Sequence, residues 1–475
     1  MASSPEVIMV EFEGDHPQDW PKLRKWSIMI TLAISMFLMS LSSTIVAPAA
    51  DVIGEEFHTS PALRPMALSL FLLMYCLGPV FVGPLSELHG RWPIIQTGSV
   101  IYLAFNTAAG FSRSMTQLLV FRLLSGAGGS ASLAVGASMV GDVFRKEERG
   151  LPMAVCQMGP ILGSCLGPLA GGYIAEYTDW RWAFYATSIA VGVFLVLSFI
   201  TARETYAPIL LQRKKKTMME HAVNMKKEQS FVWKTPYEKE GETFIQLYRR
   251  TLFRCLYFLG TQPIVQALAC FYGYLFGLVY LLLASFSDLW NDRYHMRLST
   301  GTLNYVAPCI GYLLGALICA LLTDRVYRYQ VNRNNGVGKP EFRLPMMIPS
   351  SLLVPIGLLW YGWCAEYKTH WILPDIGVAL PLLGATVVFQ CVNAYLLDTY
   401  PVYAASASGC VYIVRGLAGF GFPLFSPTLY SNLGYGWGNS LLALVALSLG
   451  CPLPFILWRY GARLRAASSY ADHEK

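Results

Sequence analysis

The sequence predicts an all-α integral membrane protein with 12 transmembrane helices, arranged as two pseudo-symmetric six-helix bundles. Three observations predict this class: a composition poor in charge, repeated apolar runs, and a one-sided distribution of basic residues. Of the 475 residues, 54% are apolar and only 14% are charged. Soluble proteins carry about 25% charged residues, so this chain has too few charges to cover a water-facing surface of its size.

The apolar runs are long enough to cross a bilayer, which takes about 20 mostly apolar residues in a helix. A first set of expected spans covers residues 27–49, 63–84, 93–112, 117–141, 150–172 and 181–201. A second set covers residues 258–284, 300–322, 344–364, 373–397, 404–427 and 440–460. We therefore expect bundles over 27–201 and 258–460, a polar loop over 202–257, and tails over 1–26 and 461–475.

The basic residues test this count, because cytoplasmic loops are enriched in Lys and Arg. If the N-terminus is cytoplasmic, only six of the 36 basic residues fall in outer loops. A missed or extra span would blur this bias. We predict that both tails and the loop 202–257 are cytoplasmic. Acidic residues precede the first long run, which argues against a cleaved secretory signal.

The sequence also excludes several classes of protein. It contains no G-x-x-x-x-G-K-[ST] loop and no soluble stretch that could house a nucleotide-binding domain, which excludes an ATP-driven pump. All seven histidines fall outside the expected span cores, so we expect no metal site, no haem and no enzymatic centre. The basic residues lie in short stretches between apolar runs, which disfavours nucleic acid as a partner.

The fifth expected span has an unusual pattern of small residues. Four glycines recur at every fourth position, with a proline beside the first and the third. They are Gly159, Pro160, Gly163, Gly167, Pro168 and Gly171. Small residues at this spacing share a helix face and let another backbone approach closely. We expect a close-contact and flexing helix, with ordinary packing as the alternative.

Three segments together resemble the signature motifs of the major facilitator superfamily. They are the loop Gly83–Pro93, the Arg122…Gly126 start of the fourth span, and the glycine–proline pattern of the fifth, which is similar to the antiporter signature. Further stretches resemble the fungal drug:proton antiporter branch with 12 spans: residues 179–184, 204–208, 340–345, 355–363 and 395–400. The resemblance covers about residues 20–460.

This resemblance implies the major facilitator fold and a secondary active transporter without a cofactor. It implies export of lipophilic or amphipathic small molecules, such as drugs or secondary metabolites, by proton antiport with alternating access. We expect a monomer in the plasma membrane, with the vacuolar membrane as the alternative. A polyamine or other organic-cation transporter is the first alternative function, although the span cores lack the acidic residues that it needs. A non-transporting receptor or scaffold is the alternative of a different class.

The resemblance also implies a cytoplasmic charge cluster of Glu87, Arg91 and Asp142 that links the two halves and changes between states. The loop departs from the family, because Glu87 stands where Asp is usual and two of the family's cations are missing from residues 88–92. We therefore expect a weaker clamp at the inner gate.

Charged groups inside spans are expensive and are functional candidates by default. Arg122 is expected roughly 8 Å below the outer surface. It either extends to that surface or faces the cavity, where the resemblance implies a role in proton coupling. Arg415 lies deeper in its span and needs a partner, which Asp398 or backbone carbonyls could supply. The first span contains no Asp or Glu, so the proton route stays open, with Asp142, Glu87 and Asp398 as candidates.

Amide and aromatic side chains within spans are the candidates for lining a substrate cavity. They are Asn106, Gln157, Gln262, Gln266, Tyr272, Trp360, Phe389, Gln390, Asn393 and Tyr395. A cavity with many rings, few amides and little charge suits amphipathic organic molecules. The alternative is that these residues pack against lipid or inside the bundles.

Overall fold

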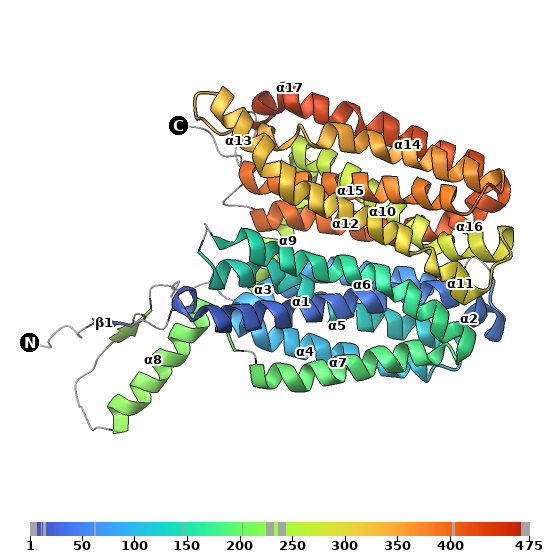
Figure 1. Ribbon diagram of the computed structural model, residues 1–475. Helices are drawn as coiled ribbons and strands as arrows, with labels where there is room; N and C mark the ends of the chain where they lie inside the picture. Colours follow the sequence, from blue (N-terminus) through green and yellow to red (C-terminus); the bar gives the residue numbers. More distant parts are fainter. Residues whose placement is uncertain are drawn as a thin grey trace, which may run out of the picture.

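The computed structural model describes residues 7–10, 12, 16–60, 63–145, 148–201, 203–224, 232–235, 244–400 and 404–466. Nearly all of these residues lie in helices, most of which run side by side along one direction (Figure 1). The N-terminal half contains η1 (Pro17–Asp19), α1 (Lys22–Thr44), η2 (Ala47–Ala49), α2 (Ala50–Glu56), α3 (Met66–His89), α4 (Arg91–Gly110), α5 (Met115–Val143), α6 (Gly150–Tyr177) and α7 (Arg181–Thr201).

Two helices and a short strand pair lie outside the bundles or between them. They are α8 (Ala207–Asn224), α9 (Phe244–Thr261) and the parallel pair of β1 (Val7–Met9) and β2 (Val232–Lys234). The C-terminal half contains α10 (Pro263–Asp288), η5 (Leu289–Arg293), α11 (Leu298–Leu303), α12 (Val306–Ile318), η6 (Cys319–Thr323), α13 (Asp324–Arg333), η7 (Pro340–Arg343), α14 (Met347–Glu366), α15 (Ile372–Thr399), α16 (Ala404–Gly450) and α17 (Pro452–Ala466). The turns η5 and η6 are π-helical.

The prediction of 12 spans is confirmed. Ten segments of the described chain are long and apolar enough to cross a membrane. One of them, Ser406–Arg465, contains two spans, because Gly434 breaks α16 with a φ of 71° that glycine adopts readily. Dividing that segment adds one span, and α4, which packs against α5 and α7, adds the other.

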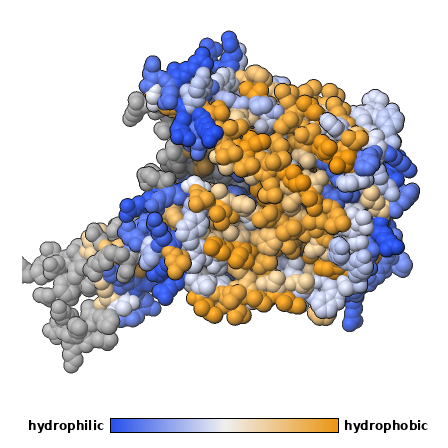
Figure 2. All heavy atoms as spheres, viewed as in Figure 1, coloured by the Kyte–Doolittle hydropathy of each residue, from blue (hydrophilic) through white to orange (hydrophobic). Residues whose placement is uncertain are grey.

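The bundle has two distinguishable ends. Helix α1 begins and α17 ends at what we call the terminal end, whereas η2, α2 and α11 lie at the far end (Figure 1). Between them, apolar residues form a broad band, with hydrophilic residues gathered at both ends of the molecule (Figure 2). This band is the surface that a lipid bilayer would cover.

The glycines of α6 let it pack directly against the backbone of α1. A Cβ atom at Gly159 would lie 2.6 Å from the Ala33 carbonyl oxygen, and one at Gly167 would lie 2.7 Å from the Leu41 oxygen. Gly163 and Gly171 meet the same helix, one on each side of Gly167 along α6. The predicted close contact is confirmed, and its partner is the first span.

Pro168 of α6 leaves one backbone oxygen free for the same interface. Pro168 has no N–H to donate to the carbonyl of Ser164, four residues earlier. Thr44 of α1 donates to that oxygen through its hydroxyl at 3.2 Å. One turn earlier, the Ser40 hydroxyl donates to the carbonyl of Pro160 at 2.7 Å. The Thr44 hydroxyl therefore satisfies the oxygen that Pro168 leaves without a helical donor, and the Ser40 hydroxyl adds a second hydrogen bond between α1 and α6.

The boundary of the seventh span differs from the prediction. We expected residues 258–284, but α10 begins at Pro263 and continues to Asp288. Gln262 has an extended backbone, and proline is well suited to the first position of a helix. The stretch predicted as a loop contains α8, and α9 occupies its last part. Both helices mix charged and apolar residues, so neither has the long apolar run of a membrane span.

A tight connection joins the last two spans at the far end. The backbone N–H of Gly436, two residues after the break at Gly434, donates to Glu366 Oε2 at 3.1 Å. The same carboxylate accepts a hydrogen bond from Arg293 at 3.2 Å. Glu366 therefore ties the end of α14 to the last two spans and to η5.

Candidate functional site

The two halves meet where α3 packs against α16, at about the mid-length of α3. A Cβ atom at Gly416 would lie 3.1 Å from Cys76, and one at Gly419 would lie 2.7 Å from Leu72. Glycine at both positions therefore allows this close approach. Arg415 lies beside the contact and is only 8% exposed, so the interface of the halves encloses a positively charged side chain.

Aromatic rings surround the Arg415 guanidinium. Its carbon atom lies 4.2 Å from the ring centroid of Tyr412 and 5.2 Å from that of Phe276, within the range of cation–π attraction. Tyr272 and Cys76 are its other close neighbours. Among the described residues, no carboxylate forms a salt bridge with Arg415, and its Nε has no hydrogen-bond partner. An unpaired cation at this depth costs several kcal/mol.

Asp398, one of the two partners expected for Arg415, is bound elsewhere. Its Oδ2 accepts a hydrogen bond from Arg343 Nε at 2.9 Å. Asp398 lies in the last turn of α15, at the terminal end, whereas Arg415 is 11 residues into α16. Eleven residues of helix span about 16 Å, so these two side chains lie at different depths.

Three of the predicted cavity residues lie around Arg415. The rings of Tyr272 and Phe389 have centroids 4.3 Å apart. Asn393 is close enough to Tyr272 to interact with its hydroxyl. Gln390 lies one turn before Asn393, and residues three apart share a side of the helix. The structure thus brings these predicted residues of α10 and α15 together, and their role in lining a substrate cavity stays a prediction.

Both halves contribute further polar groups that the sequence did not single out. Tyr280 of α10 lies next to Ser43 of α1 and Ser164 of α6. Tyr75 of α3 faces the same region, and its buried hydroxyl has no hydrogen-bond partner within the described ranges. The predicted Gln157 lies two turns before Ser164 on α6, where it is exposed.

We call this group the central cluster and define it by the following residues. They are Tyr75, Tyr272, Phe276, Tyr280, Phe389, Asn393, Tyr412 and Arg415. It joins one guanidinium, one amide, several hydroxyls and many ring faces where the two halves touch. Such a surface can bind the apolar rings of a ligand and one polar or negatively charged substituent.

Other predicted cavity residues lie inside one bundle. Asn106 is fully buried between α4 and α7. Its Nδ2 is 2.9 Å from the hydroxyl of Thr187, 2.9 Å from that of Ser188 and 3.0 Å from the carbonyl of Phe184. This amide joins two helices of the N-terminal half, so its prediction as a cavity residue is wrong.

Gln262 and Gln266 belong to the junction of α9 and α10. Gln266 Nε2 donates to the carbonyl of Leu259 at 2.7 Å, and Gln262 is the residue between the two helices. The helix boundary explains this correction, since α10 begins only at Pro263. Both amides stabilise a turn instead of lining the central cluster.

Trp360 and Tyr395 also lie away from the central cluster. Trp360 is 42% exposed and shares a stripe of α14 with exposed Leu352, Ile356 and Leu359, which is the spacing of one helix face. This face belongs to the apolar outer surface. Tyr395 is fully buried within the C-terminal half. A single sequence shows that a residue lies in a span but not which way it faces.

Arg122 is fully buried in the N-terminal half, so the alternative in which it extends to the membrane surface is wrong. Its Nε donates to the carbonyl of Ala67 in α3 at 2.9 Å, and Nη2 donates to that of Ser42 in α1 at 3.2 Å. The guanidinium also lies 4.2 Å from the ring of Phe71. Arg122 thus joins α1, α3 and α5 through backbone oxygens.

The predicted cluster at the terminal end forms in part. Arg91 Nε donates to Asp142 Oδ2 at 3.2 Å, which joins the start of α4 to the end of α5. Glu87 is exposed and makes no hydrogen bond or salt bridge with the residues that the structure describes. Arg91 and Asp142 both belong to the N-terminal half, so the expected link between halves is not present in this state.

Glu204, and not Glu87, is the glutamate that binds next to Arg91 at the start of α4. It is buried, and its carboxylate accepts the backbone N–H groups of Arg91 and Trp92 at 2.9 and 3.2 Å. Gly90 has a φ of 100°, and a side chain there would collide with this carboxylate. Glu204 therefore caps the first turn of α4, whose N–H groups have no helical partners.

The C-terminal half carries a comparable set of ion pairs at the terminal end. Arg343 is bonded to Asp398 and lies 3.4 Å from Asp324. Arg465 binds Glu341 through two hydrogen bonds of 2.9 Å, and both side chains are buried. Every salt bridge among the described residues stays within one half.

Contacts between the halves are found instead at the far end. Glu176 of α6 accepts the backbone N–H of Ser299 in α11. Gly172 packs against Thr302, and Cys165 lies next to Cys309 of α12. The halves are therefore joined at the far end and at the central cluster, while the described ion pairs leave the terminal end without a cross-link.

Two six-helix halves that enclose a polar and aromatic contact, within an apolar belt, define a membrane transporter. The chain belongs to the Major Facilitator Superfamily, whose family model matches residues 32–423. It is 40% identical over 470 residues to the MFS-type transporter oryF of Aspergillus oryzae, covering 99% of this chain and 96% of the relative. It is also 40% identical over 461 residues to the efflux pump vrtL of Penicillium aethiopicum, covering 97% and 90%. It is a transporter and not an enzyme.

Solved structures show the same fold. The xylose transporter XylE from E. coli, in a partially occluded inward open conformation, matches with a TM-score of 0.65 at 14% identity, covering 92% of this chain and 99% of that one. A bacterial homolog to the human lysosomal transporter Spinster matches with a TM-score of 0.64 at 14% identity, covering 94% and 99%. The predicted fold class is confirmed.

Proposed function

We propose that this transporter exports small lipophilic or amphipathic organic molecules by proton antiport, with its terminal end in the cytoplasm and the plasma membrane as its location. The observation that carries the proposal is the central cluster. The name of the efflux pump vrtL, given to a relative that spans nearly the whole chain, supports export as the direction. The excess of basic residues on the N-terminal side supports the orientation.

The chemistry of the central cluster favours particular substrates. Ring faces from α3, α10, α15 and α16 offer apolar contact, and Arg415 adds one positive charge with an unused donor. A neutral or weakly acidic amphipathic molecule would be held by both. A cation would be repelled by Arg415 at this position, so the cluster does not favour the organic-cation alternative.

Alternating access follows from the position of the contacts between halves. In the present arrangement, the far end is joined through Glu176 and Ser299, and the terminal end has no described ion pair across the halves. A substrate would enter the central cluster from the terminal end. The halves would then rock about the α3–α16 contact, so that the far end opens and the terminal end closes.

Proton coupling requires a carboxylate whose charge alters this balance. Asp142 and Asp398 are paired with arginines of their own halves, and protonation would weaken both pairs. Arg122 would transmit the movement, because its guanidinium fixes the end of α1 to α3. In this mechanism, replacing Arg122 impairs transport although every residue of the central cluster is still present.

The test is transport into proteoliposomes that hold the purified full-length protein, with an imposed pH gradient and a panel of neutral, acidic and cationic lipophilic compounds. We expect gradient-driven transport of neutral or acidic compounds, a loss of at least tenfold in Arg415→Gln, and loss of the response to the gradient in Arg122→Ala. Arg113→Gln, at an exposed loop position, should match the wild type. Transport that ignores the pH gradient would exclude antiport, and an Arg415→Gln variant with full activity would exclude the central cluster as the binding site.

A further inference from the structure

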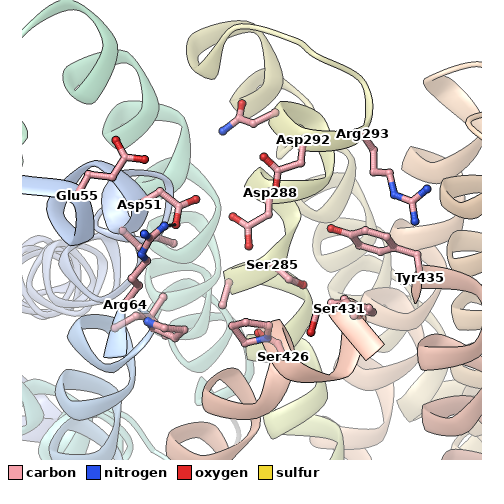
Figure 3. A pocket seen from close by; sticks show the side chains of 18 residues that line it. Asp51, Glu55, Arg64, Ser285, Asp288, Asp292, Arg293, Ser426, Ser431 and Tyr435 are labelled. Atoms are coloured by element: carbon pink, nitrogen blue, oxygen red, sulfur yellow. Dashed lines mark hydrogen bonds and ion pairs between the residues drawn. The ribbon is translucent and has the colours of Figure 1, made fainter. Parts of the chain in front are cut away.

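A cavity lies between the two halves at the far end. It has a volume of about 670 Å3 and is lined by residues of η2, α2, α3, α10, η5 and α16, and by Arg64 and Pro65 before α3. Ser426 lies at its inner side, and Asp292 is exposed to the solvent at its outer side (Figure 3). Leu68, which is buried, also lines the cavity. Leu68 precedes Tyr75 of the central cluster by two turns of α3, so this cavity lies closer to the far end than the central cluster does.

The cavity has an excess of negative charge. Its charged lining residues are Asp51, Glu55, Arg64, Asp288, Asp292 and Arg293. Four carboxylates thus face two guanidinium groups, and each half contributes two of the carboxylates. Asp51 and Asp288 lie opposite each other across the boundary of the halves (Figure 3).

The two arginines already have partners, which leaves most of the carboxylates unpaired. Arg64 is bonded to Asp51 at 2.7 Å, and Arg293 is bonded to Glu366, outside the cavity lining, at 3.2 Å. Among the residues that the structure describes, no salt bridge involves Glu55, Asp288 or Asp292. These three groups can therefore act together on a positively charged ligand.

An aromatic wall with a free hydroxyl completes the site. The rings of Tyr430 and Tyr435 are stacked, with centroids 4.5 Å apart and planes at 17°. Tyr435 is only 7% exposed, yet its hydroxyl has no hydrogen-bond partner within the described chain. Figure 3 shows this hydroxyl pointing into the cavity, towards the side of Asp288 and Asp292. Because this hydroxyl reaches the cavity and makes no other hydrogen bond with the described residues, its oxygen can accept an N–H donor of a ligand.

These features fit an organic cation better than a metal ion. Within the described residues, no three metal-binding side chains are close enough to hold a metal. The cavity is also far larger than a metal ion needs, and its aromatic rings offer apolar contact to the carbon substituents of an amine. An ammonium group offers up to three N–H donors, which match the carboxylates and the Tyr435 oxygen.

We propose that the far-end cavity is a binding site for a protonated organic amine, held by Asp288 and Asp292 of one half, Glu55 of the other, and Tyr435. Because the carboxylates come from both halves, the amine bridges the halves where they meet. An amine bound there favours the arrangement in which the far end is joined, and it slows the opening of that end. The binding site itself does not depend on the proposed export activity, whereas its effect on opening rests on the alternating access proposed above.

The test measures binding of phenethylammonium to purified full-length protein in detergent at pH 7, with 2-phenylethanol as an uncharged probe of the same shape. We expect the ammonium to bind at least tenfold more tightly than the alcohol, and to bind less tightly as the salt concentration rises. Asp288→Asn should weaken its binding about tenfold or more, since a hydrogen bond to a charged group contributes that much. Tyr435→Phe, which removes only the hydroxyl, should weaken it several-fold.

Asp375→Asn is the matched control. Asp375 is also a buried carboxylate in the C-terminal half near the far end, but it lines a different groove, with Trp371 and Ile376. It should leave phenethylammonium binding unchanged. Equal affinity for the ammonium and the alcohol would overturn the proposal, as would wild-type affinity in both Asp288→Asn and Tyr435→Phe. If Asp288→Asn does not fold, Glu55→Gln at an exposed position takes its place.

The amine could be a free solute or the headgroup of an aminophospholipid. The same titration in nanodiscs of phosphatidylcholine, with and without phosphatidylethanolamine, separates these sources. Weaker phenethylammonium binding in the presence of phosphatidylethanolamine assigns the site to the lipid headgroup, and unchanged binding assigns it to a free amine. Absence of binding in both kinds of nanodisc, at concentrations that saturate the detergent sample, would overturn the site in a membrane.

Discussion

Replacing Gly163 by alanine tests the packing on which the N-terminal half depends. The new Cβ atom would lie 2.7 Å from the Leu41 nitrogen and 2.9 Å from the Ser40 Cβ in α1. Carbon atoms pack at about 3.5–4.0 Å, so the Ser40 contact alone requires α6 and α1 to separate by roughly 0.6–1.1 Å. The Phe37 carbonyl oxygen of α1 lies closer still and requires more. Overpacking of this kind costs about 1–3 kcal/mol. We therefore expect Gly163→Ala to be clearly less stable than the wild type.

The assay is the midpoint of thermal unfolding of detergent-solubilised protein, followed by size-exclusion chromatography of heated samples. Gly192→Ala in α7 is the matched control, because a Cβ atom there meets nothing within 4 Å. Alanine is favoured over glycine inside a helix by about 1 kcal/mol, so the control should unfold at the wild-type temperature or above it. Gly163→Ala should unfold at a lower temperature and should also transport more slowly.

The unfolding temperatures of the two variants test whether the contact between α6 and α1 requires glycine at position 163. If Gly163→Ala and Gly192→Ala unfold at the same temperature, the contact between α6 and α1 is not limited by the missing side chain. The glycine pattern would then have to serve flexibility alone. A stable Gly163→Ala variant with impaired transport would point the same way.

Three further predictions follow from named contacts. Glu204→Gln should destabilise the protein by about 1.5–3 kcal/mol, because one amide oxygen replaces a carboxylate that accepts four backbone N–H groups. Glu87→Gln should leave the stability unchanged. Equal unfolding midpoints of the two variants would contradict the role of Glu204 as the cap of α4. Mercuric ion should cross-link Cys165 to Cys309 across the halves. The two halves should then migrate together on a gel after proteolysis of the central loop. An equal yield of cross-linked product in Cys165→Ser would refute the contact. Trp360→Ala should transport within about twofold of the wild type if its face meets lipid, whereas a large loss would place it on the substrate path.

Hydropathy and spacing predicted most of the architecture, because both report properties that lipid imposes on a helix. The twelve spans follow from the length of the apolar runs, and the contact of α6 follows from the spacing of its glycines. Tyr272, Phe389 and Asn393 were placed in the site for a similar reason, since polar and aromatic groups inside spans tend to avoid lipid. These inferences required no knowledge of which helices are neighbours.

Inferences that depended on helix faces and neighbours failed more often. Asn106 and Trp360 satisfy the same composition rule as Tyr272, yet one is bonded inside a bundle and the other faces outward. The prediction of Asp398, one of the two partners expected for Arg415, was wrong, because Asp398 lies at a different depth and binds Arg343. Tertiary packing determines which side of a helix faces a neighbouring helix, and a single sequence does not show this.

Asp288 shows how a small boundary error conceals a site. The seventh span was expected to end at residue 284, which left Asp288 in a loop. Pro263 is the signal that could have corrected it, because proline favours the first turn of a helix. A helix of 26 residues from Pro263 ends at Asp288, and this carboxylate then faces the boundary of the halves.

The hydrogen bonds of Glu366 have a mechanical consequence. This one carboxylate fastens η5 and the junction of the last two spans to the end of α14, so the outer rim of the C-terminal half should move as a rigid plate. Asp288 and Asp292 would travel with that plate, and Asp51 and Glu55 would travel with the other half. The distance between the carboxylates of the two halves would then increase as the far end opens. A pair of spectroscopic labels, one on each half at the far end, would measure this distance directly.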